Sequence, residues 1–214
     1  GIFDRCKEHS PIENVLECAK EVKKVSPDII LTIGGGTPID TVKVVQLCIT
    51  LGINSAEELK KISGNVQNIT SKIRQIAVPT TLSGGEYSVV GGAMDTEKKL
   101  KQGYFGSDIC PKVVILDPHI SVHTPEWLWL STAVRSVDHA VEGFCSISKN
   151  PMISHNALEA LRIFSNSLRK TKKDLNNIEA RSQSQKAVWI VAKNMGNVMT
   201  VSYTHLTLPT IFRV

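Results

Sequence analysis

Three consecutive glycines, Gly34, Gly35 and Gly36, follow a short apolar stretch and precede Thr37 and Pro38. The apolar stretch over residues 28–33 has the length and β-branched content of a buried strand. We expect Thr37 to cap a helix and Pro38 to occupy its first position. Glycines let a backbone approach a phosphate closely, and the amides of a helix N-terminus favour negative charge. The pattern predicts an anion-binding turn, and a tight turn that binds nothing has the same pattern.

A second polar loop follows a predicted strand over residues 74–79 and reads Thr-Thr-Leu-Ser-Gly-Gly-Glu over residues 80–86. Ligands of parallel sheets bind at the carboxyl ends of the strands. Hydroxyl groups at that edge suit hydrogen bonding to a sugar or a phosphate. An ordinary polar loop has the same composition.

The elements that would position these loops alternate between strand and helix. Helical periodicity occurs over residues 11–25, 38–51 and 55–63, and strand patterns occur over residues 28–33, 74–79, 88–94 and 112–117. This order predicts an α/β fold with a parallel sheet and right-handed crossovers. After residue 118 the patterns over residues 125–147, 152–170 and 178–199 are long and helical. We therefore expect one domain over residues 1–120 and an all-helical domain over residues 121–199.

The last fifteen residues, 200–214, do not continue this helical pattern. The stretch over residues 201–210 is β-branched and closely resembles a translated sequencing-adapter oligonucleotide. We expect a non-native tail there, with a genuine C-terminal strand as the alternative. His205 is not evidence for a metal site in either case.

Composition excludes several classes of partner. The net charge of +5 includes clusters around residues 20–24 and 169–173, which suit the surface of helix ends, and aromatic residues are only 5% of the chain. We therefore expect no nucleic-acid site and, because no stretch is apolar enough to span a bilayer, no membrane segment. Five cysteines without CxxC spacing favour a reducing, cytoplasmic environment. The chain starts at Gly1 in mid-pattern, so we expect upstream residues and leave organellar targeting open.

Four segments in order resemble the iron-containing, or group III, alcohol dehydrogenases. This superfamily also includes maleylacetate reductase and glycerol dehydrogenase, and it shares its fold with dehydroquinate synthase. The resemblance covers about residues 1 to 200, and four motifs in order are far more specific than any one of them. The segments are Gly-Gly-Gly-Thr-Pro-Ile-Asp-Thr-Val-Lys at 34–43, Val-Pro-Thr-Thr-Leu-Ser-Gly-Gly-Glu at 78–86, Val-Ile-Leu-Asp-Pro at 114–118 and Val-Asp-His-Ala-Val-Glu-Gly at 137–143.

The resemblance implies a partial dinucleotide-binding domain followed by a partial helical domain, with the active site between them. It implies NAD or NADP as cofactor, iron or zinc in many members, a small-molecule alcohol, ketone or keto acid as substrate, and allows a homodimer. It also implies that the chain lacks the strands that normally carry the acidic residue choosing between NAD and NADP. Later helices with further metal-binding histidines would be absent as well.

The resemblance assigns cofactor-binding roles to residues of both glycine-bearing loops. Asp40 would lie near the nicotinamide end of the cofactor, and its alternative role is helix capping from the first turn. The pyrophosphate loop would be Gly34, Gly35, Gly36 and Thr37, and the adenine and ribose would lie along Thr80, Thr81 and Leu82.

Two departures from the family pattern concern the catalytic residues and the second loop. Iron-dependent members place an aspartate four residues before the histidine that corresponds to His139, whereas this chain has Arg135 there. A guanidinium cannot ligate a cation, and Asp138 lies about 100° round the helix from His139. We therefore expect His139 and Arg135 to be catalytic without a metal, with a buried structural histidine as the alternative for His139. The loop over residues 83–86 is one residue shorter than usual, as in maleylacetate reductase.

The favoured function is hydride transfer between a nicotinamide cofactor and an alcohol or ketone, with Arg135 or protonated His139 stabilising the alkoxide. If Arg135 instead grips a carboxylate, a maleylacetate-like keto acid is the substrate. A non-catalytic nucleotide-binding homologue and a dehydroquinate-synthase-like lyase are the rivals, and the lyase would require the metal that Arg135 disfavours. Trp127 and Trp129 are expected to serve core or hinge packing, or less favourably to form a substrate wall.

Overall fold

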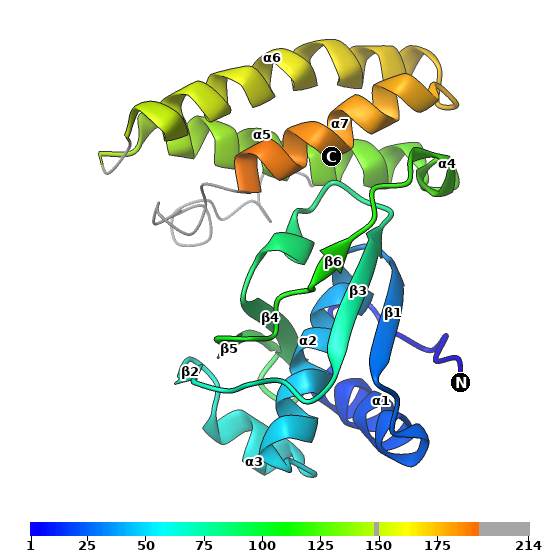
Figure 1. Ribbon diagram of the computed structural model, residues 1–214, viewed down its shortest axis with the longest axis vertical. Coiled ribbons are helices and arrows are strands. Elements are labelled where there is room, and N and C mark those ends of the chain that lie inside the picture. Colours follow the sequence, from blue (N-terminus) through cyan, green and yellow to red (C-terminus); the bar gives the residue numbers. More distant parts are fainter. Residues whose placement is uncertain (148–149, 193–214) are drawn as a thin grey trace. The chain divides into compact units, whose positions relative to one another are not determined.

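The computed structural model describes residues 1–147 and 150–192, which form two compact units (Figure 1). The first unit comprises residues 1–80 and 85–117, and the second comprises residues 81–84 and those from Pro118 onward. The domain limits expected at residues 120 and 199 stay predictions. The expected non-native tail lies outside the described residues.

The first unit contains the predicted parallel sheet. Strands β1 (Ile29–Gly34), β3 (Arg74–Pro79) and β6 (Val113–Val114) pair in parallel in the order β1-β3-β6. Gly34 pairs with Pro79 in the register of β1 and β3. The carboxyl ends of these two strands therefore lie side by side, so the glycine turn and the start of the second loop leave the same edge of the sheet.

A second, mixed sheet departs from the expected single sheet. Strands β2 (Val66–Gln67) and β5 (Leu100–Gly106) pair in parallel, and β4 (Val90–Asp95) pairs antiparallel with β5. The strand expected over residues 88–94 is therefore present as β4, but it belongs to this second sheet. The strand signal of β5 is weak because two glycines and a lysine dilute its apolar pattern.

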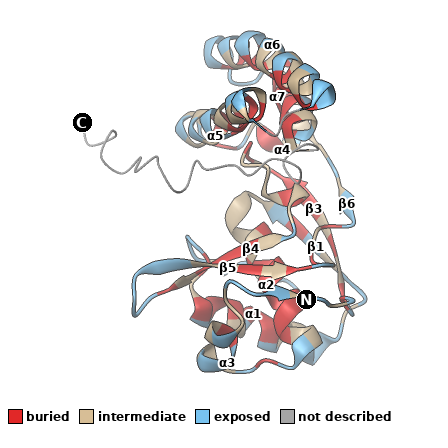
Figure 2. Cartoon of the chain, turned by 90° about the vertical axis from the view of Figure 1, so that its left-hand side faces the viewer, coloured by how far each residue is buried: buried red, intermediate tan, exposed pale blue. Residues whose placement is uncertain are grey.

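Helix α2 (Gly36–Leu51) is buried over almost its whole middle, which Figure 2 shows in red. It contacts β1, β3 and β4, and helix α1 (Ile12–Val25) packs against it. The short helix α3 (Ala56–Lys61) begins with a capping box between Ser55 and Glu58. Because elements surround α2, even its charged Lys43 is fully buried.

The second unit is helical among its described residues apart from residues 81–84 and the connecting loops. Its helices are α4 (Pro118–Ser121), α5 (Glu126–Cys145), α6 (Pro151–Lys173) and α7 (Ile178–Ala192), and α6 packs against both α5 and α7. The α/β fold class with a following helical part is thus confirmed. Within residues 1–147 and 150–192 no helix is long and apolar enough to cross a membrane.

The two tryptophans of α5 have different environments. Trp129 is fully buried, and the guanidinium of buried Arg181 lies 4.6 Å from the centre of its ring. Arg181 also donates hydrogen bonds to the carbonyls of Ser121 and Leu175, which ties α7 to α4. Trp127 is 70% exposed, so core packing is wrong for it, whereas core packing is confirmed for Trp129. The hinge role stays a prediction.

A carboxylate in the first unit makes the stability of the fold pH-dependent. Asp108 accepts hydrogen bonds from Lys112, from Arg74 and from the Ser71 amide, and the Lys112 bond above all lowers the pKa of Asp108 to about 2. A pKa below the unfolded value stabilises the fold above about pH 4, and this contribution is lost as the pH falls toward 2.

We expect Asp108→Asn to lower the free energy of unfolding by about 1 kcal/mol at pH 7, because both cationic partners are partly exposed. Urea unfolding between about pH 3 and pH 7 should show the difference from wild type shrinking as the pH falls. The exposed Glu8, changed to Gln, is the control. A difference that stays constant over this range would contradict the assignment.

Candidate active site

The glycine turn is built on the N-terminus of α2. The helix begins at Gly36, with Gly35 as its N-cap, so Thr37 is not the cap and Pro38 occupies the third helical position. This corrects the expected helix start at residue 38. Gly35 has no side chain that could accept a hydrogen bond from the first-turn amides. The amides of Gly36 and Thr37 lack intrahelical acceptors by geometry, so the helix end fits an anion.

Gly34 has a backbone conformation that requires glycine. Its φ angle is +153°, and an added Cβ would lie 2.6 Å from the Cγ atom of Pro38. The glycine at this position therefore lets the strand turn sharply into α2 with the proline ring packed over it.

The second loop begins against the first. The amide of Thr80 donates a hydrogen bond to the carbonyl of Gly34 at 2.9 Å. Gly34 through Thr37 and Thr80 are all partly exposed. The structure therefore brings Thr80 to the glycine turn, as expected from the carboxyl ends of two neighbouring parallel strands.

Thr81 and Leu82 belong to the helical unit instead. The Leu82 amide donates to the hydroxyl of Thr132 at 3.1 Å, and its carbonyl accepts from the hydroxyl of Ser136 at 2.6 Å. The Leu82 side chain is fully buried. Both backbone polar groups of Leu82 are thus engaged by α5, and the cofactor contact predicted for Thr81 and Leu82 stays a prediction.

Asp40 lies in the second turn of α2 rather than the first, so the capping alternative is wrong. Its carboxylate oxygens lie 3.7 Å from the Nζ atom of Lys43 and 3.9 Å from that of Lys101. Lys43 also donates to Ser88 Oγ at 3.0 Å, to the Val90 carbonyl at 2.9 Å and to the Gly85 carbonyl. Burial lowers the pKa of Lys43, and the Asp40 charge opposes this shift. Lys43 therefore holds residues 85–90 against α2.

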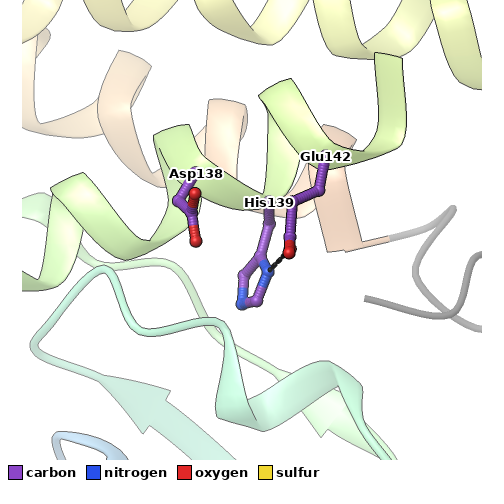
Figure 3. A group of neighbouring side chains, drawn as sticks. All are labelled: Asp138, His139 and Glu142. Carbon is purple, nitrogen blue, oxygen red and sulfur yellow. Dashed lines mark hydrogen bonds and ion pairs between the residues drawn. The ribbon is translucent and has the colours of Figure 1, made fainter. Parts of the chain in front are cut away.

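Helix α5 carries the other predicted residues on one stripe. Arg135, His139 and Glu142 are spaced i, i+4 and i+7, which places them on the same face. Arg135 Nε donates to His139 Nε2 at 3.4 Å, and His139 Nδ1 lies 3.3 Å from Glu142 Oε2 (Figure 3). The His139 side chain is only 5% exposed, whereas Arg135 is exposed. The structure thus joins the two predicted catalytic residues through a direct hydrogen bond.

The charges around His139 oppose each other. Burial lowers the pKa of His139, the Arg135 guanidinium lowers it further, and the Glu142 carboxylate opposes both effects. Burial raises the pKa of neighbouring Asp138, with a further contribution from Glu142. The imidazole is therefore held neutral beside a permanent cation.

Comparison with known proteins decides the family. Residues 1–118 match the iron-containing alcohol dehydrogenase family, and residues 130–208 match the C-terminal part of the Fe-containing alcohol dehydrogenase family. The chain belongs to the iron-containing alcohol dehydrogenase family. The resemblance inferred from four short motifs is thereby confirmed.

Three relatives illustrate the range of the family. Dehydrogenase ALT3 of Alternaria alternata is 36% identical over 88% of this chain and 54% of its own length. Maleylacetate reductase of Pseudomonas sp. strain P51 is 26% identical over 92% of this chain and 49% of its own length. The crystal structure of an iron-containing alcohol dehydrogenase from Thermotoga maritima matches with a TM-score of 0.78 at 26% identity, over 94% of this chain and 54% of that one. This chain therefore spans about half the length of the relatives it matches.

The family is named for iron, so the side chains around His139 can be compared with those that a transition metal requires. Asp138, His139 and Glu142 each offer a ligand atom, and these atoms lie within 4.8 Å of one another. Asp138 is thus nearer to His139 than its position round the helix suggested. However, one ring nitrogen of His139 accepts from the Arg135 guanidinium, and the other pairs with Glu142. The permanent positive charge of Arg135, which lies beside His139 Nε2, opposes a dication there, so these residues do not fit a transition metal.

Sequence reasoning missed Glu142 and Lys43. Both lie inside segments that carried the resemblance, and both are three residues after a residue already singled out, His139 and Asp40 respectively. The i, i+3 spacing on a helix was therefore the signal that could have identified them.

Proposed function

We propose that the complete protein is a nicotinamide-dependent oxidoreductase that moves a hydride between the cofactor and a small alcohol or carbonyl compound without a bound transition metal. The observation that carries this proposal is the hydrogen bond between Arg135 and His139 in a chain of this family. The hydrogen bond holds the Arg135 guanidinium, a positive charge, at the position where iron-dependent members have a metal-ligating aspartate.

The glycine turn supports the cofactor assignment. The α2 N-terminus offers the amides of Gly36 and Thr37 to an anion, and Gly34 allows the close approach of a backbone. We assign the pyrophosphate of NAD or NADP to this turn and keep Asp40 and Thr80 as further contacts. When bound, the nicotinamide supplies or accepts the hydride.

Arg135 supplies the charge that carbonyl reduction requires. Hydride addition to a carbonyl carbon leaves the electron pair of the broken π bond on the oxygen, which then takes a proton from water. A guanidinium near that oxygen stabilises the developing charge, and it is permanently ionised at any working pH. Because Arg135 is exposed and held at Nε by His139, we assign it this role.

A keto acid is the second candidate substrate. A guanidinium binds a carboxylate in bidentate fashion, and the matched relatives include maleylacetate reductases at 26% identity. In this version Arg135 would bind the carboxylate, and its loss would raise KM more than it lowers kcat.

The test measures metal content and turnover in the full-length protein. We expect far less than one iron or zinc per chain by elemental analysis, and oxidation of NADH or NADPH by aldehydes or keto acids that survives treatment with a chelator. Arg135→Met should lower kcat/KM by about 100-fold, because it removes a charge that acts on the reacting oxygen or on a carboxylate. Arg162→Met is the matched control, since Arg162 is exposed and forms an ion pair with Glu159 on the surface of α6.

Three outcomes would contradict the proposal. Stoichiometric metal with activity that chelation removes and metal restores would refute the metal-free site. NADH binding without turnover of any carbonyl substrate would favour a non-catalytic nucleotide-binding protein. Equal activity of Arg135→Met and wild type would remove Arg135 from the site.

A further inference from the structure

The contacts of Arg135 determine which nitrogen of His139 carries the proton. A guanidinium has five N–H donors and no acceptor. Because Arg135 Nε donates to His139 Nε2, that nitrogen must present its lone pair. The proton of the neutral ring therefore lies on Nδ1, where it faces Glu142 Oε2 at 3.3 Å.

We propose that Glu142 is a positioning residue that fixes the Nδ1–H tautomer of His139, so that the bare Nε2 holds the Arg135 guanidinium in place for the substrate. The inference rests on the proposed function, because it assumes that Arg135 acts on the substrate. It changes the role of His139, which becomes a positioning residue rather than a proton donor through Nε2.

Burial strengthens the contact between His139 and Glu142. The side chains of His139 and Glu142 are only 5% and 17% exposed, so water competes weakly for their polar atoms. Without an acceptor at Nδ1, the ring would be free to place its proton on Nε2. Two donors, Arg135 Nε–H and His139 Nε2–H, would then face each other, and the guanidinium would lose its support.

Glu142 rather than Asp138 performs this role. In Figure 3 the dashed line joins the ring to Glu142, and the Asp138 side chain projects from the helix on the other side of the imidazole. Burial raises the pKa of Asp138, and the Glu142 charge adds to this effect, so Asp138 is the less favourable site for a negative charge. Asp138 therefore provides a matched control, a carboxylate of the same helix beside the same ring.

The first arm of the experiment reads the tautomer directly. Long-range ¹H–¹⁵N correlation of the full-length protein, with labelled histidine, distinguishes a protonated from a bare ring nitrogen, and His139→Gln identifies the signals. At about pH 8, where histidine is neutral, we expect Nδ1 protonated and Nε2 bare in the wild type. Glu142→Ala should shift the signals toward the Nε2–H form, whereas Asp138→Asn should leave them unchanged.

The second arm reads activity. Glu142→Ala should lower kcat/KM by about 10-fold or more, in the range seen when a partner that orients an active-site histidine is removed. Glu142→Gln should recover part of the loss, because the amide oxygen still accepts from Nδ1–H, and Asp138→Asn should lose little. Circular dichroism and NADH affinity report whether each variant is folded, and Glu142→Gln keeps the test available if Glu142→Ala is not.

The outcomes separate this inference from the proposed function. A wild-type ring with its proton on Nε2, or a tautomer unchanged in Glu142→Ala, overturns the inference whatever the activity. A shifted tautomer with unchanged kcat/KM also overturns it, because the tautomer then does not matter to the reaction. If the wild type binds NADH but turns over no substrate, the proposed function fails, and the claim that Glu142 positions a group for catalysis fails with it. The tautomer measurement would still show whether His139 Nδ1–H donates to Glu142.

Discussion

Gly35→Val in the full-length protein should weaken NADH binding by about 100-fold, which corresponds to about 2.7 kcal/mol, while the fold survives. Gly35 is the N-cap of α2, with φ −82° and ψ −161°, a conformation that valine adopts readily. The side chain would stand beside the Gly36 and Thr37 amides, where a pyrophosphate must approach the backbone. Isothermal titration with NADH measures the effect, and thermal unfolding shows whether the variant is intact.

Gly34→Ala provides the contrast for this prediction. Its φ of +153° and the 2.6 Å approach of an added Cβ to the Pro38 ring make that substitution a defect of folding. We expect Gly34→Ala to lower stability and binding together, and Gly35→Val to lower binding alone. NADH affinity equal to wild type in folded Gly35→Val would show that the turn does not bind the cofactor.

The parallel sheet and the long helices were predictable because their signals are local. The strand over residues 74–79 ends at a proline, and its bounds match β3. The start of α2 was predicted two residues too late, because Thr37 and Pro38 suit an N-cap and a first position in isolation. In the structure the helix starts at Gly36 and the Pro38 ring packs over Gly34, a contact between two positions that could not be deduced from either residue alone.

Environments that depend on tertiary packing were the least predictable. Trp127 and Trp129 are two residues apart on a helix and so point in very different directions. Composition gave no reason to bury only Trp129 beside Arg181, a residue of a helix far along the sequence. The mixed sheet was missed for a similar reason, since β5 is stabilised by pairing with β4 and β2 rather than by its own residue preferences.

In the candidate site, too, some features could be predicted from the sequence and others depend on tertiary packing. The i, i+4 spacing of Arg135 and His139 places both on one helix face, and their hydrogen bond agrees with it. The direction of that bond, from which we infer the position of the ring proton, became apparent only in the three-dimensional structure. The environment of Leu82 also became apparent only in the structure. Its sequence context predicts a cofactor contact, and nothing in the sequence indicates that Thr132 and Ser136 form hydrogen bonds with its backbone.

Lys43→Met should lower the free energy of unfolding by about 3 kcal/mol, because it breaks a buried set of polar contacts without replacing them. Methionine has a similar length, so the volume of the side chain is largely kept. The carbonyls of Gly85 and Val90 and the hydroxyl of Ser88 would lose the charged donor Lys43, and the two carbonyls would keep their hydrogen bonds from Ser88. Urea unfolding measures the total loss. Hydrogen exchange of the amides over residues 85–90 should accelerate about 100-fold, because this segment loses its attachment to α2.

Lys101→Met is the matched control for this prediction. Lys101 also reaches Asp40, at 3.9 Å, but its side chain is 50% exposed, so its removal should cost less than about 1 kcal/mol. Both variants thus remove a positive charge that faces the Asp40 carboxylate, and only Lys43→Met also removes a fully buried charged donor from the carbonyls of Gly85 and Val90. Equal effects would mean that the ion pair with Asp40 accounts for the stability. A large effect confined to Lys43→Met would mean that holding residues 85–90 against α2 is the reason why a lysine is buried in the middle of this helix.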